Sequence, residues 1–187
     1  GNLPTGHRST QRKTQPSGTR RRLNQGVAET KSTTTQADDT VEMLEAYSAI
    51  DVALANLNAN AAAFRASEDN AFIQGLGENA VDDIIYGMDV DGTVSDEYMK
   101  GLAARYNSTT GTIGSYVISA SGSGSDNTSL WLVTWGPKTT TLIYPKGSQA
   151  GLKIQDLGER PWDDASGNPY QAYVTHFMWY LGLAVLD

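Results

Sequence analysis

NANAAAFRASEDNAFIQGLGENAVDDIIY, residues 58–86, has the apolar spacing of one long amphipathic helix. Its large apolar residues recur at intervals of eight or four, which places them on one face of a helix with 3.6 residues per turn. The expected core positions of this helix are Phe64, Phe72, Leu76, Ala80 and Ile84. At 1.5 Å per residue the helix would be roughly 40 Å long, about the width of a small domain. An ordinary core helix of many folds fits the same pattern.

The segments that flank the helix predict shorter elements. Residues 40–48, TVEMLEAYS, have mixed alternation and predict a strand with a register slip. Ser48 followed by Asp51 resembles a capping box, so a short helix is expected to begin there and lead into the long one. Gly87 is expected to end the long helix.

The last third of the sequence predicts β-structure. SLWLVTW (129–135) and TTTLIYP (139–145) predict a hairpin that turns at Gly136-Pro137-Lys138. Residues 145–169 are expected to be loop-rich. Residues 170–187 predict one long or two short buried strands.

Composition excludes several classes of function. The 187 residues include no cysteine, which rules out disulfides, thiolate zinc sites and a cysteine nucleophile. The two histidines, His7 and His176, argue against imidazole-based catalysis or metal binding. The longest apolar run has 13 residues, too few to span a bilayer, and no signal peptide is recognisable. Neither Gly1 nor Asp187 resembles a natural end, so the chain is expected to be part of a longer protein.

The net charge of −7 is distributed unequally along the chain. Residues 1–31 hold seven Lys and Arg and one acid, whereas the rest holds seven basic groups and twenty acids. A basic segment on an acidic body predicts one of two partners, nucleic acid or the body of another copy. We favour the second partner, because so acidic a body would weaken any attraction to a polyanion.

The basic segment is too polar to fold by itself. In residues 1–38 the only large apolar side chains are Leu3, Leu23 and Val27. Such a segment buries too little apolar surface to offset the entropy of folding. Pro16-Ser17-Gly18 is a turn signal between Thr-rich stretches. The alternatives are therefore a disordered tail and a long hairpin arm that becomes ordered on a neighbour.

One motif is typical of an enzyme. Residues 89–94, DVDGTV, match the DxDGT[VL] pattern of haloacid-dehalogenase-type phosphohydrolases, with Asp89 as nucleophile, Asp91 as general acid and Mg²⁺ between carboxylates. That chemistry requires a buried parallel strand before the motif and βα repeats after it, whereas a helical pattern precedes it here. We favour a solvated acidic turn, and we assign no catalytic, cofactor-binding or metal-binding residue.

A second alternative comes from aromatic residues in the last third of the chain. They are Trp131, Trp135, Tyr144, Trp162, Tyr170, Tyr173, Trp179 and Tyr180. On strands, aromatic rings can form a sugar-binding face or a base-stacking platform, although sheet core and subunit interface are commoner roles. A β-rich carbohydrate-binding module is therefore the other alternative function.

Several motifs together indicate a family. They are GNLPTGHRSTQRKTQPSGTRRRLNQGV (1–27), KSTTTQ (31–36), MLEAYSAIDVALANLNANAAAFRASEDNAF (43–72), KGLAARYN (100–107), DNTSLWLVTWGPKT (126–139), IYPKGSQAGLKIQDLGE (143–159) and YQAYVTHFMWYLGLAV (170–185). In this order, over nearly the whole chain, they resemble the major capsid proteins of a group of tailed bacteriophages with the Hong Kong 97-type fold. Family members are longer at both ends. The family pattern generally lacks DxDGT, so residues 88–96 are expected to be a variable loop.

The resemblance implies an α+β fold with three regions. Residues 1–38 would form a basic extended arm, a hairpin that lies across an adjacent subunit. Residues 39–105 would form the peripheral domain, with a spine helix at about 58–86. Residues 106–187 would belong to a β-rich axial domain or insertion, incomplete at its C-terminus.

The resemblance also implies a function without catalysis. The chain would be a structural subunit of an icosahedral capsid, which self-assembles into hexamers and pentamers around double-stranded DNA. No cofactor and no membrane are expected, and a decoration or scaffolding protein is a further expected partner. The expected location is the virion capsid, assembled in the bacterial host cytoplasm. The expected subunit-interface residues are the basic Arg12, Lys13, Arg20, Arg21 and Arg22, facing the acidic Asp38, Asp39, Glu42 and Glu45 of the next copy.

Overall fold

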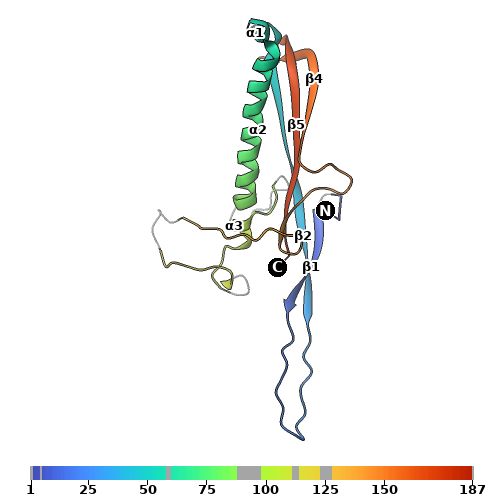
Figure 1. Ribbon diagram of the computed structural model, residues 1–187, viewed down its shortest axis with the longest axis vertical. Helices are drawn as coiled ribbons and strands as arrows, with labels where there is room; N and C mark the ends of the chain where they lie inside the picture. Colours follow the sequence, from blue (N-terminus) through green and yellow to red (C-terminus); the bar gives the residue numbers. More distant parts are fainter. Residues whose placement is uncertain are drawn as a thin grey trace.

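The computed structural model of the chain contains one long helix beside a sheet of five strands (Figure 1). It describes residues 2–4, 6–57, 60–87, 98–110, 114–122 and 128–186. The elements are β1 (Gly6–Thr14), β2 (Thr33–Asp51), α1 (Val52–Leu57), α2 (Ala61–Tyr86), α3 (Leu102–Arg105), β3 (Thr140–Ile143), β4 (Leu152–Asp163) and β5 (Pro169–Val185). The fold class is α+β, because the named strands pair antiparallel and the helices are separate from them in sequence.

Helix α2 confirms the helix predicted at residues 58–86. It begins after Asn60, whose Oδ1 accepts a 3.1 Å hydrogen bond from the Ala63 N–H and caps the first turn. It ends at Tyr86, and the Gly87 N–H donates the last helical hydrogen bond to the Asp83 carbonyl at 2.9 Å. Helix α2 packs on β2 and β5 (Figure 1).

Strand β5 is the centre of the sheet. Strand β2 pairs with one edge of it, and β3 and β4 pair with different parts of its other edge. The buried β-structure predicted at 170–187 is confirmed, and it forms one long strand. A strand with so many apolar residues is expected at the middle of a sheet, where its side chains can be covered. The pairing of β2 with β5 joins residues before and after position 105 in one sheet.

The core lies between the C-terminal half of α2 and the end of β5. Its buried members are Ala80, Met99, Leu102, Leu181, Leu183 and Val185. Nearer the middle of α2, Phe72 stacks on the fully buried Phe177, with ring centroids 5.7 Å apart. These contacts tie the helix to the sheet over much of its length.

Strand β2 exchanges one partner for another along its length. Residues 33–40 pair with β1, and residues 41–51 pair with β5. Glycine lets the strands approach closely at this point. A Cβ on Gly6 would lie 2.4 Å from the Asp39 carbonyl oxygen, and a Cβ on Gly182 would lie 2.8 Å from the Thr40 carbonyl oxygen. Since β2 runs through without a break, the β1–β2 hairpin leaves the body in a fixed direction (Figure 1).

The predicted hairpin of 129–135 with 139–145 is wrong. Residues 129–135 form no regular strand, and Trp135 makes only an isolated bridge to Thr140. Strand β3 instead pairs with the end of β5, because that edge offers an apolar partner. Residues 145–169, expected to be loop-rich, contain strand β4, which the apolar pattern did not indicate because most of its side chains are exposed.

Residues 40–51 form the predicted strand and lead into the predicted short helix, but the register slip and the capping box are wrong. Strand β2 pairs with β5 without the expected register slip. Ser48 is buried within the strand and caps nothing. Asp51 alone begins α1, because its Oδ1 accepts a 2.7 Å hydrogen bond from the Ala53 N–H.

Candidate subunit interface

The arm is the hairpin of β1, the connecting residues 15–32 and the first part of β2. Its two strands are joined by backbone pairing and by side chains. Arg8 donates two hydrogen bonds of 2.6 Å to the Asp38 carboxylate, and the Thr14 and Thr33 hydroxyls lie 2.7 Å apart. The guanidinium of Arg8 holds the pKa of Asp38 below its usual range. Of the two alternatives from the sequence, the described residues form a hairpin and not an unstructured tail, and ordering of the arm on a neighbour stays a prediction.

The tip of the arm is turned at Arg22–Gln25. The Gln25 N–H donates to the Arg22 carbonyl at 3.3 Å, and Asn24 has a positive φ of 62°. The turn expected at Pro16-Ser17-Gly18 is therefore wrong, because Asn tolerates the left-handed conformation that reverses the chain. The side chain of Leu23 is 92% exposed at this tip.

The basic residues predicted at the interface lie on the exposed surface of the arm. Arg12, Arg20, Arg21 and Arg22 are all exposed. The Arg21 Nη1 donates a 3.2 Å hydrogen bond to the Gln25 carbonyl and so steadies the turn. The side chain of Lys13 lies outside the described residues. The tip therefore presents a dense group of cations that has no acidic partner among the described residues.

The four acids expected to receive these cations are bound within their own subunit. Asp38 pairs with Arg8, and Asp39 pairs with Arg105 at 2.7 Å. Glu45 contacts the His176 Nε2 and accepts a hydrogen bond from the Tyr47 hydroxyl. Asp39 and Glu42 are also buried, with 3% and 4% of their surface exposed. Asp39 and Glu42 are therefore covered by their own subunit, and the pairing of these acids with the arm of another copy stays a prediction.

Burial under α2 makes Glu42 harder to ionise than an exposed glutamate. Its Oε2 accepts a 2.8 Å hydrogen bond from the Met99 N–H, and its Oε1 has no partner in the described part of the chain. Loss of hydration raises the pKa of Glu42 to about 7, against the effect of the Met99 N–H, and the nearby Asp83 carboxylate adds to the rise. Burial raises the pKa of Asp83 as well.

Arg105 holds the arm to the body. Its Nη2 donates to Asp39 of β2 and, at 2.9 Å, to the Leu183 carbonyl of β5. These contacts lie next to the point where β2 changes partners. Arg105 was not among the residues predicted from the sequence, since a lone arginine 66 positions from its acid carries no local signal.

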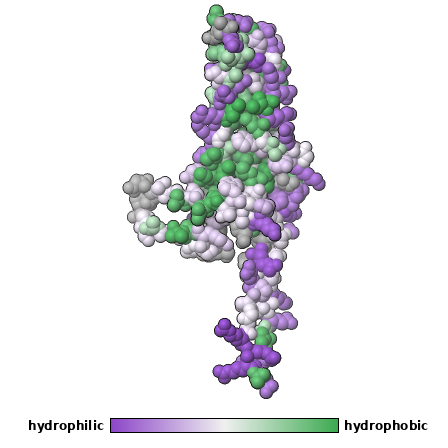
Figure 2. Space-filling view, in the orientation of Figure 1, coloured by the Kyte–Doolittle hydropathy of each residue, from purple (hydrophilic) through white to green (hydrophobic). Residues whose placement is uncertain are grey.

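The spine-helix core residues face the sheet to different degrees. Leu76 and Ala80 are buried, whereas Phe64, Phe72 and Ile84 are half-buried. Another face of α2 carries exposed apolar and acidic side chains, with Val81 58% exposed. Figure 2 shows apolar surface over this part of the molecule and hydrophilic surface along its edges.

Among the described residues we see no assembled site for either alternative function, the phosphohydrolase or the carbohydrate-binding module. The DVDGTV motif lies outside the described residues, and the element before it is α2 rather than a parallel strand. The aromatic residues do not share one platform: Trp131 and Trp179 pack against the core, and the ring of Tyr173 lies 4.8 Å from the Arg65 guanidinium carbon. Within the described ranges no three His, Cys, Asp or Glu side chains are placed to hold a metal ion. No helix described here is long and apolar enough to cross a membrane.

Comparisons with known proteins agree with the resemblance seen in the motifs. The family model for the major capsid protein GP7 matches residues 1–187. A chain in the solved structure of bacteriophage epsilon15 is 35% identical, with a TM-score of 0.65 over 100% of this chain and 56% of that chain. The present chain thus spans about half the length of the epsilon15 chain. Among curated proteins, the comparison finds no match. Because the family model matches every residue, this chain belongs to the major capsid protein GP7 family.

Proposed function

We propose that the chain is a structural subunit of a tailed-bacteriophage capsid with the Hong Kong 97-type fold. Copies of the chain assemble into hexamers and pentamers, which close into an icosahedral shell around double-stranded DNA. Membership of the GP7 family supports this role, and so does the likeness to the epsilon15 chain. The arrangement of a long helix along a sheet with a projecting hairpin agrees with the spine helix and arm expected from the resemblance.

The projecting arm is the observation that carries the proposal. Residues 15–32 are exposed throughout and lie away from the body in Figure 1. A two-stranded hairpin in water is marginally stable, so a hairpin of this length needs contacts that its own subunit does not provide. A neighbouring copy supplies them in a shell.

Many weak contacts of this kind are sufficient for a closed shell. Each exposed ion pair contributes roughly 0–1 kcal/mol, but symmetry repeats every contact around each ring of subunits. Because β2 is continuous from the arm into the body, the base of the arm is held before assembly, and less entropy is lost when subunits associate.

The remaining parts of the proposal follow from the capsid role. We assign residues 1–38 to the arm, 39–105 to the peripheral domain and 106–187 to a β-rich axial or inserted region, although the β2–β5 pairing crosses the last boundary. Non-specific contact with packaged DNA, a decoration or scaffolding partner, assembly in the host cytoplasm and residence in the virion belong to the same proposal.

Electron microscopy of the purified protein tests the capsid role directly. We expect polyhedral particles of uniform size. Single subunits that remain monodisperse under every assembly condition would contradict the proposal, whatever the arm does.

A triple substitution tests the role of the arm within that function. We expect Arg20→Ala, Arg21→Ala and Arg22→Ala together to prevent assembly and to leave the melting temperature of the subunit unchanged, because these side chains are exposed. The control carries Lys138→Ala, Lys146→Ala and Lys153→Ala, which remove three exposed cations from the body. Shells of normal size and yield from the arm variant would refute the arm assignment.

A further inference from the structure

We propose that Glu42 of β2 and Asp83 of α2 form a carboxyl pair that acts as a pH-sensitive switch at the base of the arm. While the pair holds one proton, it keeps the segment 98–105 against the body. When the proton leaves, the two carboxylates repel each other and this corner of the subunit opens. The inference goes beyond the capsid role and does not depend on it, because both residues lie within one subunit.

Three parts of the chain meet at Glu42, namely β2, the end of α2 and the segment 98–105. Glu42 lies just after the point where β2 changes its partner from β1 to β5. Its Oε2 accepts a hydrogen bond of 2.8 Å from the Met99 N–H. The end of α2 packs closely on the same segment, since a Cβ on Gly101 would lie 2.8 Å from the Asp83 carbonyl oxygen. The Glu42 carboxylate is therefore enclosed where these three parts join.

The charge of Glu42 has no compensating cation in the described part of the chain. Asp39, three residues earlier on β2, is equally buried but pairs with Arg105 at 2.7 Å. Arg105 is engaged elsewhere, because it also binds the carbonyl oxygens of Leu183 and Lys100. Glu42 is only 4% exposed, and its Oε1 meets no donor among the described residues. A buried carboxylate without a cation is strongly driven to take up a proton.

The groups around Glu42 favour that proton. Helix α2 contributes a second carboxyl, Asp83, with the exposed Asp82 beside it, and β5 contributes the apolar Leu181 opposite Glu42. The nearest lysine in the segment 98–105, Lys100, is exposed. Loss of hydration raises the pKa of Glu42 to about 7, and burial raises the pKa of Asp83 as well. The pair therefore holds a proton below neutral pH and loses it above.

Helix α3 connects the carboxyl pair to the arm. The chain runs from Met99 directly into α3, whose last residue, Arg105, holds Asp39 at the base of the arm. Repulsion between Glu42 and Asp83 separates the end of α2 from β2, and the segment that packs on both loses its support. The hold of Arg105 on Asp39 then weakens, so the proton on the pair controls how firmly the base of the arm is fixed.

A proton fits the pair better than a metal ion does. Ca²⁺ takes about six to eight oxygen ligands. The described residues offer no group of three His, Cys, Asp or Glu side chains that could hold a metal ion. Added Ca²⁺ should therefore not replace the proton.

Amide hydrogen exchange of the whole chain tests the switch. We expect the protection factor of the Met99 amide to fall about tenfold between pH 6 and pH 8.5, because a proton bound with a pKa of about 7 is lost over this range. The Phe177 amide, in the middle of β5, is the internal reference and should stay more protected than Met99 at both pH values. A constant protection factor at Met99 would overturn the proposal. Equal protection of the two amides would also overturn it, because only the whole subunit would then be opening.

Two variants remove the switch from either side. Glu42→Gln does not titrate and keeps an oxygen for the Met99 N–H, so the protection of Met99 should be equal at both pH values. Asp83→Asn should also keep the corner closed at pH 8.5, because an amide can donate a hydrogen bond to the Glu42 carboxylate. A tenfold loss of protection in either variant would contradict the pairing. Recovery of protection in the wild-type chain when Ca²⁺ is added at pH 8.5 would assign the pair to a metal ion and overturn the switch.

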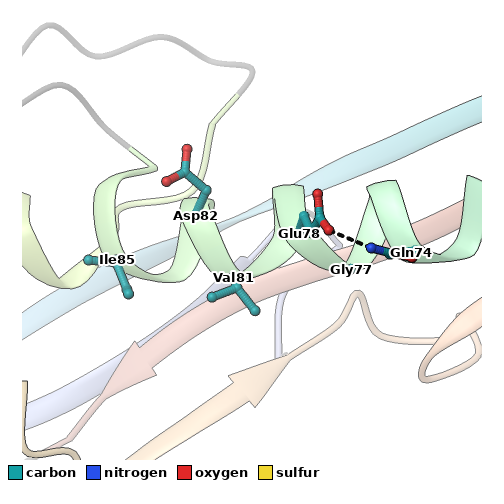
Figure 3. Close-up of a pocket in the computed structure, with 6 residues that line it drawn as sticks. All are labelled: Gln74, Gly77, Glu78, Val81, Asp82 and Ile85. Carbon is teal, nitrogen blue, oxygen red and sulfur yellow. Dashed lines mark hydrogen bonds between the residues drawn. The ribbon is translucent and has the colours of Figure 1, made fainter.

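Glu78→Gln is the matched control. Glu78 is an exposed acid of α2 that accepts a 2.9 Å hydrogen bond from Gln74 and lines an open pocket on the surface of the helix (Figure 3). It takes no part in the pair, so this variant should show the same tenfold loss at Met99 as the wild-type chain. If Glu78→Gln abolished the loss, the pH dependence would come from the general negative charge of α2, and the proposal would fail.

Discussion

The arm and the body share strand β2 but are held together by different forces. In the body, β2 is covered by α2 and paired with β5, and its inward side chains are buried. In the arm, the same strand is exposed and is held by backbone pairing to β1 and by contacts such as Arg8 with Asp38. Buried contacts in the body therefore contribute most of the free energy of folding, whereas the arm exposes surface that can contact other molecules.

This difference predicts two kinds of substitution. Changes in the body should alter the free energy of unfolding of a single subunit. Changes in the arm should alter association and leave that free energy nearly constant. Four predictions test this division, from the largest expected effect on stability to the smallest.

Phe177→Ala should have the largest effect. Phe177 is fully buried and stacks on Phe72, so its removal leaves a cavity that costs roughly 3–5 kcal/mol. Denaturant unfolding of the subunit measures the loss. Leu23→Ala in the arm is the matched change, and it should stay within about 0.5 kcal/mol of wild type because Leu23 is exposed. Equal losses in the free energy of unfolding from the two substitutions would contradict the division between body and arm.

Arg105→Met tests the junction between the two regions. It keeps most of the side-chain volume but leaves Asp39 buried without its cation, which should cost roughly 3 kcal/mol. Because Arg105 also binds the Leu183 carbonyl, the arm should lose its fixed direction and particle yield should fall. Calorimetry and particle counting are the two measurements. Unchanged stability would show that Asp39 is not held as the structure indicates.

Glu42 gives the body a pH dependence that the arm lacks. Its pKa of about 7 in the fold lies above its ordinary value of 4.5, so the folded subunit keeps a proton that the unfolded chain has lost. This stabilisation is complete below pH 4.5 and is lost as the pH rises through about 7. We expect the free energy of unfolding to fall by about 2 kcal/mol between pH 5 and pH 8.

Glu42→Gln separates this group from the other acids. The amide oxygen still accepts from the Met99 N–H but does not titrate, so stability should become nearly constant over the same range. Glu159→Gln, at an exposed position of β4, should leave the wild-type pH dependence intact. A flat wild-type profile between pH 5 and pH 8 would contradict the burial of Glu42.

Gly77→Ala should have the smallest effect and the opposite sign. Apart from its own helix backbone, the methyl group would meet no atom within 4 Å among the described residues, so the isolated chain should gain about 1 kcal/mol from better helix propensity. Gly101→Ala is the contrasting change, since its Cβ would lie 2.7 Å from the Gly87 nitrogen and should destabilise the subunit. A loss of stability in the Gly77 variant, seen by thermal melting, would mean that the outer face of α2 is already occupied within the subunit.

Local sequence patterns predicted the elements whose signal lies within one segment. The period of apolar residues identified α2, and the apolar run identified β5. The turn of the arm was placed wrongly because Pro16-Ser17-Gly18 and Arg22–Gln25 both have plausible turn chemistry, and Asn24 adopts the positive φ. Strand β4 was missed because an edge strand with mostly exposed side chains has no apolar alternation to detect.

By itself, the sequence determined the long helix, the buried C-terminal strand, the basic arm and, through its linked motifs, the capsid family. These depend on composition and on spacings shorter than a single element. Only the tertiary structure decided which charges are free. Asp39 and Glu42 look like any surface acids in the sequence, yet Arg105 and the Met99 N–H, each more than fifty residues away, bind them in the interior. Burial and pairing arise from contacts between distant segments, and a one-dimensional pattern does not contain those contacts.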